Sequence, residues 1–184
     1  RSVAGRPVPD FTRLAYGLVL DSDATVSDDG SVVGDPTEAA LVVLAAKLGV
    51  DADRTRRAYP RLAEVPFDSE YKFMATFHRV EVDGTEHLIE LVKGGPDVVL
   101  ARCSQAGGPL SGSQVPIEQQ QPRIEAANRQ MGEKGLRVLA FAARVLDDSD
   151  EQAIAQDPMS YTGNLSFVGM VGIIDPLRVE AKGA

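Results

Sequence analysis

The sequence predicts an α+β fold (mixed α/β), in which a mainly antiparallel sheet carries helices packed against it. Residues 72–82 and 85–93 are strand-like segments, and only Asp83-Gly84 separates them, a link typical of a two-residue hairpin turn. Upstream of them, Asp35 is placed to cap a helix whose first turn begins with Pro36. Strands joined by a hairpin pair antiparallel, so these observations exclude a doubly wound parallel sheet.

The remaining elements follow from hydrophobic periodicity, capping residues and turn residues. Helices are expected over 11–20, 36–48, 96–102 and 117–134, and further strands over 62–67, 136–145 and 167–174. Residues 21–34 and 105–114 are rich in turn formers and are expected to be loops, whereas 147–160 is expected to be an acidic connector.

Composition limits the classes of function. The chain has 184 residues, with 19 Lys and Arg against 27 Asp and Glu, a net charge of −8 and a pI near 4.8. The length fits one domain with a sizeable core or at most two small ones, and we expect a single domain over 1–184. The acidic balance argues against nucleic-acid binding, which needs an excess of Lys and Arg.

The sequence contains no segment that predicts a membrane span. The longest uninterrupted apolar run, 39–46, is far shorter than the roughly 20 residues that cross a bilayer. A single cysteine, Cys103, excludes an internal disulfide and a cysteine-based zinc site, and it fits a reducing compartment. No signal peptide is visible, and because the chain begins at Arg1 rather than Met, we expect it to be a piece of a longer protein.

The common motifs for covalent or metal chemistry are missing from the sequence. It has no phosphate loop of the Gly-x-x-x-x-Gly-Lys-Ser/Thr type, no Gly-x-Gly-x-x-Gly fingerprint and no Gly-x-Ser-x-Gly elbow. His78 and His87 are its only histidines, and they do not have metal spacing. We therefore expect no catalytic and no metal-ligating residue in this chain.

The hairpin register brings two lysines toward one end of the sheet. If Asp83-Gly84 is the turn, Met74 faces Lys93, and Lys72 lies diagonally across from Lys93 on the same face. Two ammonium groups that converge in this way can hold phosphates. The alternative is that both are strand-end lysines in solvent.

Other residues also allow plain structural interpretations. Glu38 is explained by its capping-box position alone, and Phe67 is either a platform for a base or a core residue. Gly94 and Gly95 either admit a ligand close to the backbone or only turn the strand into the next helix. Arg137 either reaches a phosphate or is one exposed arginine after a helix cap.

The order and spacing of these features are more specific than any one of them. Five motifs follow one another at 34–41 (GDPTEAAL), 66–74 (PFDSEYKFM), 92–97 (VKGGPD), 135–140 (GLRVLA) and 175–178 (DPLR). Together they resemble the nucleotide-binding (N) domain of P-type ATPases, in particular the calcium-pump-like (P2) branch of cation-transporting ATPases. The resemblance covers about residues 10–178. It implies a six- or seven-stranded, mostly antiparallel sheet flanked by helices.

The resemblance also implies an ATP site. Phe67 corresponds to the aromatic residue that stacks on adenine, and Glu38 to the acidic residue that contacts the adenine amino group. Lys72 and Lys93 correspond to the two lysines of the pocket, and Arg137 to the arginine that reaches the phosphates. Stacking, an acceptor for an amino group and cations on one face form a plausible ATP clamp.

The chain departs from the family pattern at four positions. The family motif Lys-Gly-Ala-Pro-Glu corresponds to residues 93–97 of this chain, and its glycine is the pocket residue Gly94. In this motif, Gly95 replaces Ala and Asp97 replaces Glu. Ser69 stands where calcium pumps of animals often carry an arginine that assists the phosphates, which predicts a weaker phosphate grip. Leu177 replaces the second proline of the hinge motif, which changes the stiffness expected there.

The implied function is that of an ATP-binding domain in a membrane cation pump. It holds the adenosine of ATP, which brings Mg²⁺ with it, and presents the γ-phosphate to an aspartate in a neighbouring phosphorylation domain. Residues 175–184 are expected to be the hinge toward that domain. The parent is expected to be an ion-translocating ATPase at the cytoplasmic face of the cell membrane, with phosphorylation and actuator domains as partners. Calcium is suggested only by the branch.

The chain itself lacks the Asp-Lys-Thr-Gly-Thr, Gly-Asp-Gly and Thr-Gly-Glu motifs of such pumps. As an isolated fragment it is therefore expected to be a soluble monomer that binds ATP without turnover. One alternative is a non-catalytic scaffold that has lost nucleotide binding and serves interdomain or regulatory contacts. A second alternative is a free-standing ATP-hydrolysing enzyme.

Overall fold

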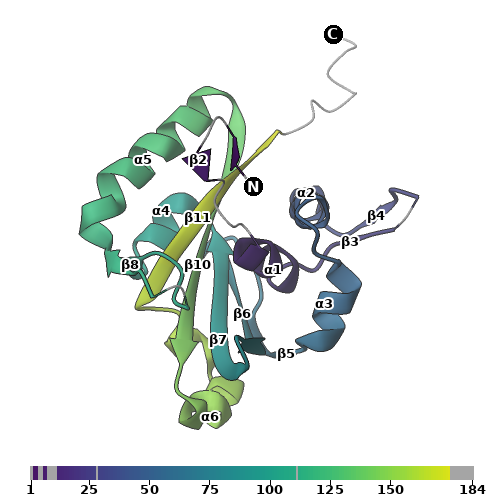
Figure 1. Ribbon diagram of the computed structural model, residues 1–184, viewed down its shortest axis with the longest axis vertical. Helices are drawn as coiled ribbons and strands as arrows, with labels where there is room; N and C mark the ends of the chain where they lie inside the picture. The colour runs from purple at the N-terminus through teal and green to yellow at the C-terminus, as the bar shows by residue number, and fades with distance from the viewer. Residues whose placement is uncertain (1, 4–5, 8–11, 28, 111, 175–184) are drawn as a thin grey trace. The chain divides into compact units, whose positions relative to one another are not determined.

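A computed structural model describes residues 2–3, 6–7, 12–27, 29–110 and 112–174 (Figure 1). The chain divides into two compact units, residues 1–61 and 62–184. The expected hinge, 175–184, with Asp175, Leu177 and Arg178, lies outside the described residues. Among the described residues, no helix is both long and apolar enough to cross a membrane.

The second unit is built on a sheet of seven strands within the described part of the chain. Its spatial order is β5 (Arg61–Val65), β6 (Phe73–Val82), β7 (Thr85–Gly94), β10 (Leu136–Leu146), β11 (Leu165–Ile174), β8 (Cys103–Ala106) and β9 (Val115–Pro116). The pairs β6–β7, β7–β10, β10–β11 and β8–β9 are antiparallel, and β11–β8 is parallel. The predicted α+β class with a mostly antiparallel sheet is confirmed.

The β6–β7 hairpin has the predicted register. Val82 pairs with Thr85 across the Asp83-Gly84 turn, and Met74 pairs with Lys93. Asp83 and Gly84 have φ angles of 52° and 78°, as a type I′ turn requires at both central positions. The pairing then continues without a shift to Phe73 opposite Gly94.

One face of this sheet carries the main core. Phe73, Ala75 and Phe77 of β6 are fully buried there, because alternate residues of a strand point to the same face. Helices supply the other half of this core through Val99 of α4 (Pro96–Leu100) and Ile124 of α5 (Ile117–Glu133). Figure 1 shows α4 and α5 next to β10 and β11.

The first unit consists mainly of three helices. These are α1 (Thr12–Leu20), α2 (Pro36–Lys47) and α3 (Ala52–Ala58), with short hairpins formed by β1 (Ser2–Val3) and β2 (Arg6–Pro7) and by β3 (Thr25–Val26) and β4 (Val32–Val33). Helix α2 begins as predicted, since the Asp35 side chain accepts hydrogen bonds from the amides of Thr37 and Glu38. It ends before Gly49, whose φ of 90° suits a glycine C-cap.

Several short elements are absent from the sequence-based prediction. Helix α3 occupies a segment rich in arginine, strands β3 and β4 lie in the segment 21–34 expected to be a loop, and β8 runs into the expected loop 105–114. The acidic connector holds η1 (Asp148–Asp150), α6 (Glu151–Gln156) and η2 (Pro158–Tyr161). Each has at most seven residues, too few for a periodic pattern to be recognised.

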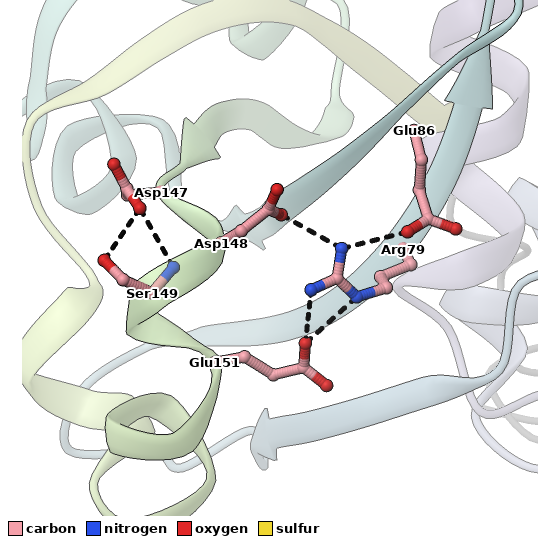
Figure 2. A network of polar contacts seen from close by, with 6 residues as sticks. All are labelled: Arg79, Glu86, Asp147, Asp148, Ser149 and Glu151. Carbon is pink, nitrogen blue, oxygen red and sulfur yellow. Dashed lines mark hydrogen bonds and ion pairs between the residues drawn. The ribbon is translucent and has the colours of Figure 1, made fainter.

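The acidic connector is tied to the hairpin by Arg79 (Figure 2). The Arg79 guanidinium on β6 donates to Glu86 on β7 at 3.0 Å, to Asp148 at 3.0 Å and to Glu151 through both Nε and Nη2. The carboxylates of Glu151 and Asp148 raise the pKa of Arg79. Asp147 caps the same turn by accepting from Ser149, which lowers the pKa of Asp147.

We expect Arg79→Met to loosen α6 locally while leaving the sheet intact. The substitution removes the donors to the carboxylates of Asp148 and Glu151 in the connector. The sheet should tolerate it, because Arg79 is partly exposed and lies near the turn end of the hairpin. Amide hydrogen exchange should show faster exchange over 151–156 and unchanged exchange in β10. Unchanged exchange in α6 would contradict an anchoring role. Arg123→Met, which replaces an exposed arginine on α5, is the matched control.

Candidate functional site

The loop between β5 and β6 carries an exposed aromatic ring. Phe67 follows Pro66 in this loop and is 62% exposed, so the alternative that it belongs to the core is wrong. The loop is shaped by Asp68, whose side chain accepts from the Glu70 amide at 2.7 Å and whose carbonyl accepts from the Lys72 amide at 2.7 Å. Phe67 therefore stands at the start of a structured turn with its ring available for stacking.

Lys72 ends that loop and does not belong to the strand. Its φ is 59°, and β6 begins one residue later at Phe73. The expectation that strand alternation places Lys72 on the same face as Lys93 is therefore wrong, because Lys72 lies outside the strand. Instead, its carbonyl accepts from the Gly95 amide at 3.2 Å, which joins the loop to the end of β7.

Gly94 lies where the end of β7 comes closest to the loop that ends at Lys72. A Cβ at this position would come within 2.5 Å of the Lys72 carbonyl oxygen and 2.8 Å of the Phe73 Cβ. The glycine is thus required for packing of the protein's own backbone. Gly95 is different, because a Cβ there would meet only the Asp97 carboxylate at 3.0 Å.

Lys93 is a buried lysine. It is 5% exposed, it pairs with Met74 on β6 and Phe141 on β10, and its Nζ lies 3.1 Å from the Met74 sulfur. The alternative of a strand-end lysine in solvent is therefore wrong for Lys93. Burial of an ammonium group is costly, which points to a use other than solubility.

Arg137 lies on the same sheet face as Lys93. It is four residues before Phe141 on β10, and β10 has no bulge between them, so the alternation of side chains keeps both on one face. Strand β7 ends at Gly94, which pairs with Ala140, so Arg137 lies beyond the end of β7 and is exposed there. The structure thus brings the Phe67 loop, Lys72, Lys93, Gly94 and Arg137 to one end of the sheet.

Glu38 belongs to the first unit, in the first turn of α2. Its Oε2 accepts from the backbone amides of Asp23 at 2.8 Å and Ala24 at 3.1 Å. The carboxylate therefore ties the loop after α1 to α2, a role that its capping-box position does not predict.

Two arginines that the sequence interpretation did not select hold the same loop. Arg56 on α3 donates to the carbonyl oxygens of Val19, Ser22 and Ala24. Arg61 donates to the Leu20 carbonyl and forms an ion pair with Asp23 at 2.9 Å. The only signal in the sequence is the basic stretch 54–61, which does not indicate its partners.

No alternative chemistry is evident in the described part of the chain. There, no group of three or more His, Cys, Asp or Glu side chains is placed to hold a metal ion. Burial raises the pKa of the Cys103 thiol to about 12, and the thiol donates to the Val99 carbonyl. Such a thiol stays protonated at neutral pH and is a poor nucleophile.

Comparison with known proteins identifies the family. The family described as "P-type ATPase, cytoplasmic domain N" matches residues 11–180. The chain belongs to this family. Its seven-stranded sheet with flanking helices is the N-domain architecture that the sequence motifs implied.

The relatives of this N domain are named as calcium- or cation-transporting ATPases. It is 37% identical to Calcium-transporting ATPase 1 of Lactococcus lactis over 92% of the chain and 18% of that protein. It is 36% identical to Probable cation-transporting ATPase F of Mycobacterium tuberculosis over 97% of the chain and 19% of that protein. It is 34% identical to Calcium-transporting ATPase type 2C member 1 of Pongo abelii over 96% of the chain and 17% of that protein. The chain thus spans less than a fifth of the length of these relatives.

Proposed function

We propose that this N domain binds ATP and presents its γ-phosphate to a phosphorylatable aspartate in a neighbouring domain of a cation pump. The observation that carries the proposal is the gathering of an exposed ring, Phe67, and the cations Lys93 and Arg137 at one end of the sheet. An aromatic face suits a purine, and cations suit phosphates. By the family resemblance, Glu38 would supply the acceptor for the adenine amino group.

The chain's own residues would act by positioning alone. Holding the nucleotide makes transfer of its γ-phosphate to a nearby aspartate effectively unimolecular, and such positioning is one of the two main sources of phosphoryl-transfer catalysis, beside electrostatic stabilisation. Mg²⁺ would arrive with the nucleotide and neutralise phosphate charge. The phosphorylation and actuator domains would be partners in the parent pump, which would lie in a membrane with this domain on its cytoplasmic face.

The parent activity would be ATP hydrolysis coupled to cation transport. The names of several relatives specify calcium as the transported ion, and calcium is our proposal for the parent of this chain. The overall charge of −8 with few local cations favours modest nucleotide affinity and ready release of ADP.

Titration of the 184-residue chain with ATP tests the proposal directly. Amide resonances around Glu38, Phe67, Lys72, Lys93 and Arg137 should shift in NMR spectra. The purified chain should show no ATP turnover, because it lacks the phosphorylation motif. Shifts confined to other regions, or no shift at millimolar ATP, would favour the scaffold alternative.

Phe67→Ala should weaken ATP binding by about 1–3 kcal/mol, the typical contribution of a base stacked on an aromatic ring. Stability should change by no more than about 0.5 kcal/mol, because the ring is 62% exposed. Tyr71→Ala, which removes a 45% exposed ring from the same loop, is the matched control and should leave affinity nearly unchanged. Equal losses in both variants would refute specific stacking by Phe67. Isothermal titration calorimetry gives both affinities.

A further inference from the structure

The loop that donates to Glu38 is held from its other side by Arg56. Residues 21–24 follow α1, and Asp21 and Ser22 are 1% exposed, so the loop is built into the first unit. Glu38 Oε2 accepts hydrogen bonds from the Asp23 amide at 2.8 Å and the Ala24 amide at 3.1 Å. Two N–H donors on one oxygen fix the plane of a carboxylate.

One peptide group connects Arg56 to Glu38. Arg56 Nη2 donates to the Ser22 carbonyl at 2.8 Å, and the amide of the same peptide unit, that of Asp23, donates to Glu38. A peptide group is planar, with its C=O and N–H on opposite sides, so fixing the oxygen fixes the direction of the N–H. A hydrogen bond on the carbonyl also polarises the amide and strengthens its donation.

Arg56 makes two more bonds that hold the ends of this segment. Its Nε donates to the Val19 carbonyl at 3.2 Å, and its Nη2 donates to the Ala24 carbonyl at 2.9 Å. A planar guanidinium can bridge several carbonyls in a fixed geometry, which a lysine ammonium cannot reproduce. The partial burial that these contacts require lowers the pKa of Arg56, although an arginine keeps its charge at neutral pH.

We propose that Arg56 is a positioning residue for base selectivity, which acts through the Ser22–Asp23 peptide to aim the Glu38 carboxylate at the exocyclic amino group of adenine. This inference rests on the proposed ATP-binding function. Glu38 would discriminate between adenine, which offers an amino group at C6, and hypoxanthine, which offers a carbonyl oxygen there. Repulsion between that oxygen and the carboxylate would add to the discrimination. Arg56 would contact no nucleotide itself.

The test compares the affinities of the 184-residue chain for ATP and ITP, which carry the same phosphates. The unsubstituted chain should prefer ATP by about tenfold to a hundredfold, as expected for one hydrogen bond to a charged group. Glu38→Ala should remove the preference. Arg56→Met should reduce it to about threefold or less, mostly through weaker ATP binding. Arg57→Met, which replaces an exposed arginine one residue further along α3, is the matched control and should keep the full preference.

The outcomes separate the two proposals. If the unsubstituted chain binds neither nucleotide, the proposed function fails and the inference fails with it. If Glu38→Ala loses the preference but Arg56→Met keeps it, the ATP function stands and the role of Arg56 is refuted. If Arg56→Met lowers ATP and ITP affinity by the same factor, Arg56 has only a general structural role, and the inference is again refuted.

A gentler substitution covers the case in which Arg56→Met does not fold. Arg56→Lys keeps the charge but cannot bridge the three carbonyls, so the preference for ATP should fall partway toward that of Glu38→Ala. Without nucleotide, hydrogen exchange of the Asp23 and Ala24 amides should speed up in both Arg56→Lys and Glu38→Ala. Protection equal to that of the unsubstituted chain in Arg56→Lys would contradict a hold on this peptide.

Discussion

Gly94→Ala is expected to destabilise the sheet-bearing unit by about 2–3 kcal/mol, the upper part of the range for overpacking a well-packed site. The added Cβ would lie 2.5 Å from the Lys72 carbonyl oxygen, 2.8 Å from the Phe73 Cβ and 2.9 Å from the Phe73 Cα. Two of these three atoms are backbone, and Phe73 is fully buried in the core. Relief would therefore require separation of β6 from β7 at their last pair.

Denaturant unfolding measures this loss, and Gly95→Ala is the control. The Cβ added by this second substitution would approach only the end of the flexible Asp97 side chain, at 3.0 Å, so the expected change is no more than about 0.5 kcal/mol. Equal stability of the two variants would show that the backbone at Gly94 can move aside. The comparison also accounts for the family motif Lys-Gly-Ala-Pro-Glu, which has Gly at the position of Gly94 and Ala at the position of Gly95.

The hairpin shows what the sequence can predict well. A two-residue Asp-Gly turn determines the register of both strands, and every pair from Val82–Thr85 to Met74–Lys93 follows from it. Helix α2 is equally predictable, because Asp35, Pro36 and Gly49 give its cap, first turn and end locally. Such local signals act within a few residues and need no knowledge of tertiary packing.

The loop conformations and tertiary contacts could not be predicted in this way. Lys72 looks like the first residue of a strand, but the turn around Asp68 and the bond to Gly95 hold it at a φ of 59°. Arg56 contacts carbonyl oxygens 32 to 37 residues away, which no local pattern encodes. For Lys72, these contacts override a local preference for strand, and for Arg56 the tertiary structure supplies partners that the local sequence does not specify.

The candidate site itself came from the order of the motifs rather than from any single residue. Phe67 could equally have been a core residue, and only its exposed ring in the structure separates the two interpretations. Lys93 could have been solvated, and its burial beside Met74 removes that alternative. The role of both residues toward ATP stays a prediction, and Lys93 offers its sharpest test.

Lys93→Met is expected to weaken ATP binding by about tenfold to a hundredfold while leaving the chain as stable as before or more stable. The loss of affinity is that of one hydrogen bond to a charged group. Stability should not fall, because the substitution removes the desolvation cost of a buried ammonium and leaves an apolar side chain of similar length in its place. Lys93 is only 5% exposed and contacts the Met74 sulfur, so the flexible, apolar side chain of methionine should fit at this position.

Thermal unfolding and calorimetric titration of the same samples separate the two effects. Lys47→Met, which removes an exposed charge from the last turn of α2, is the control for net charge and should change ATP affinity by less than about twofold. A large loss of stability in Lys93→Met would mean that the ammonium is retained for the fold. Opposite changes in affinity and stability would instead mean that its burial is a cost of function, because a desolvated ammonium attracts phosphate more strongly than one in water.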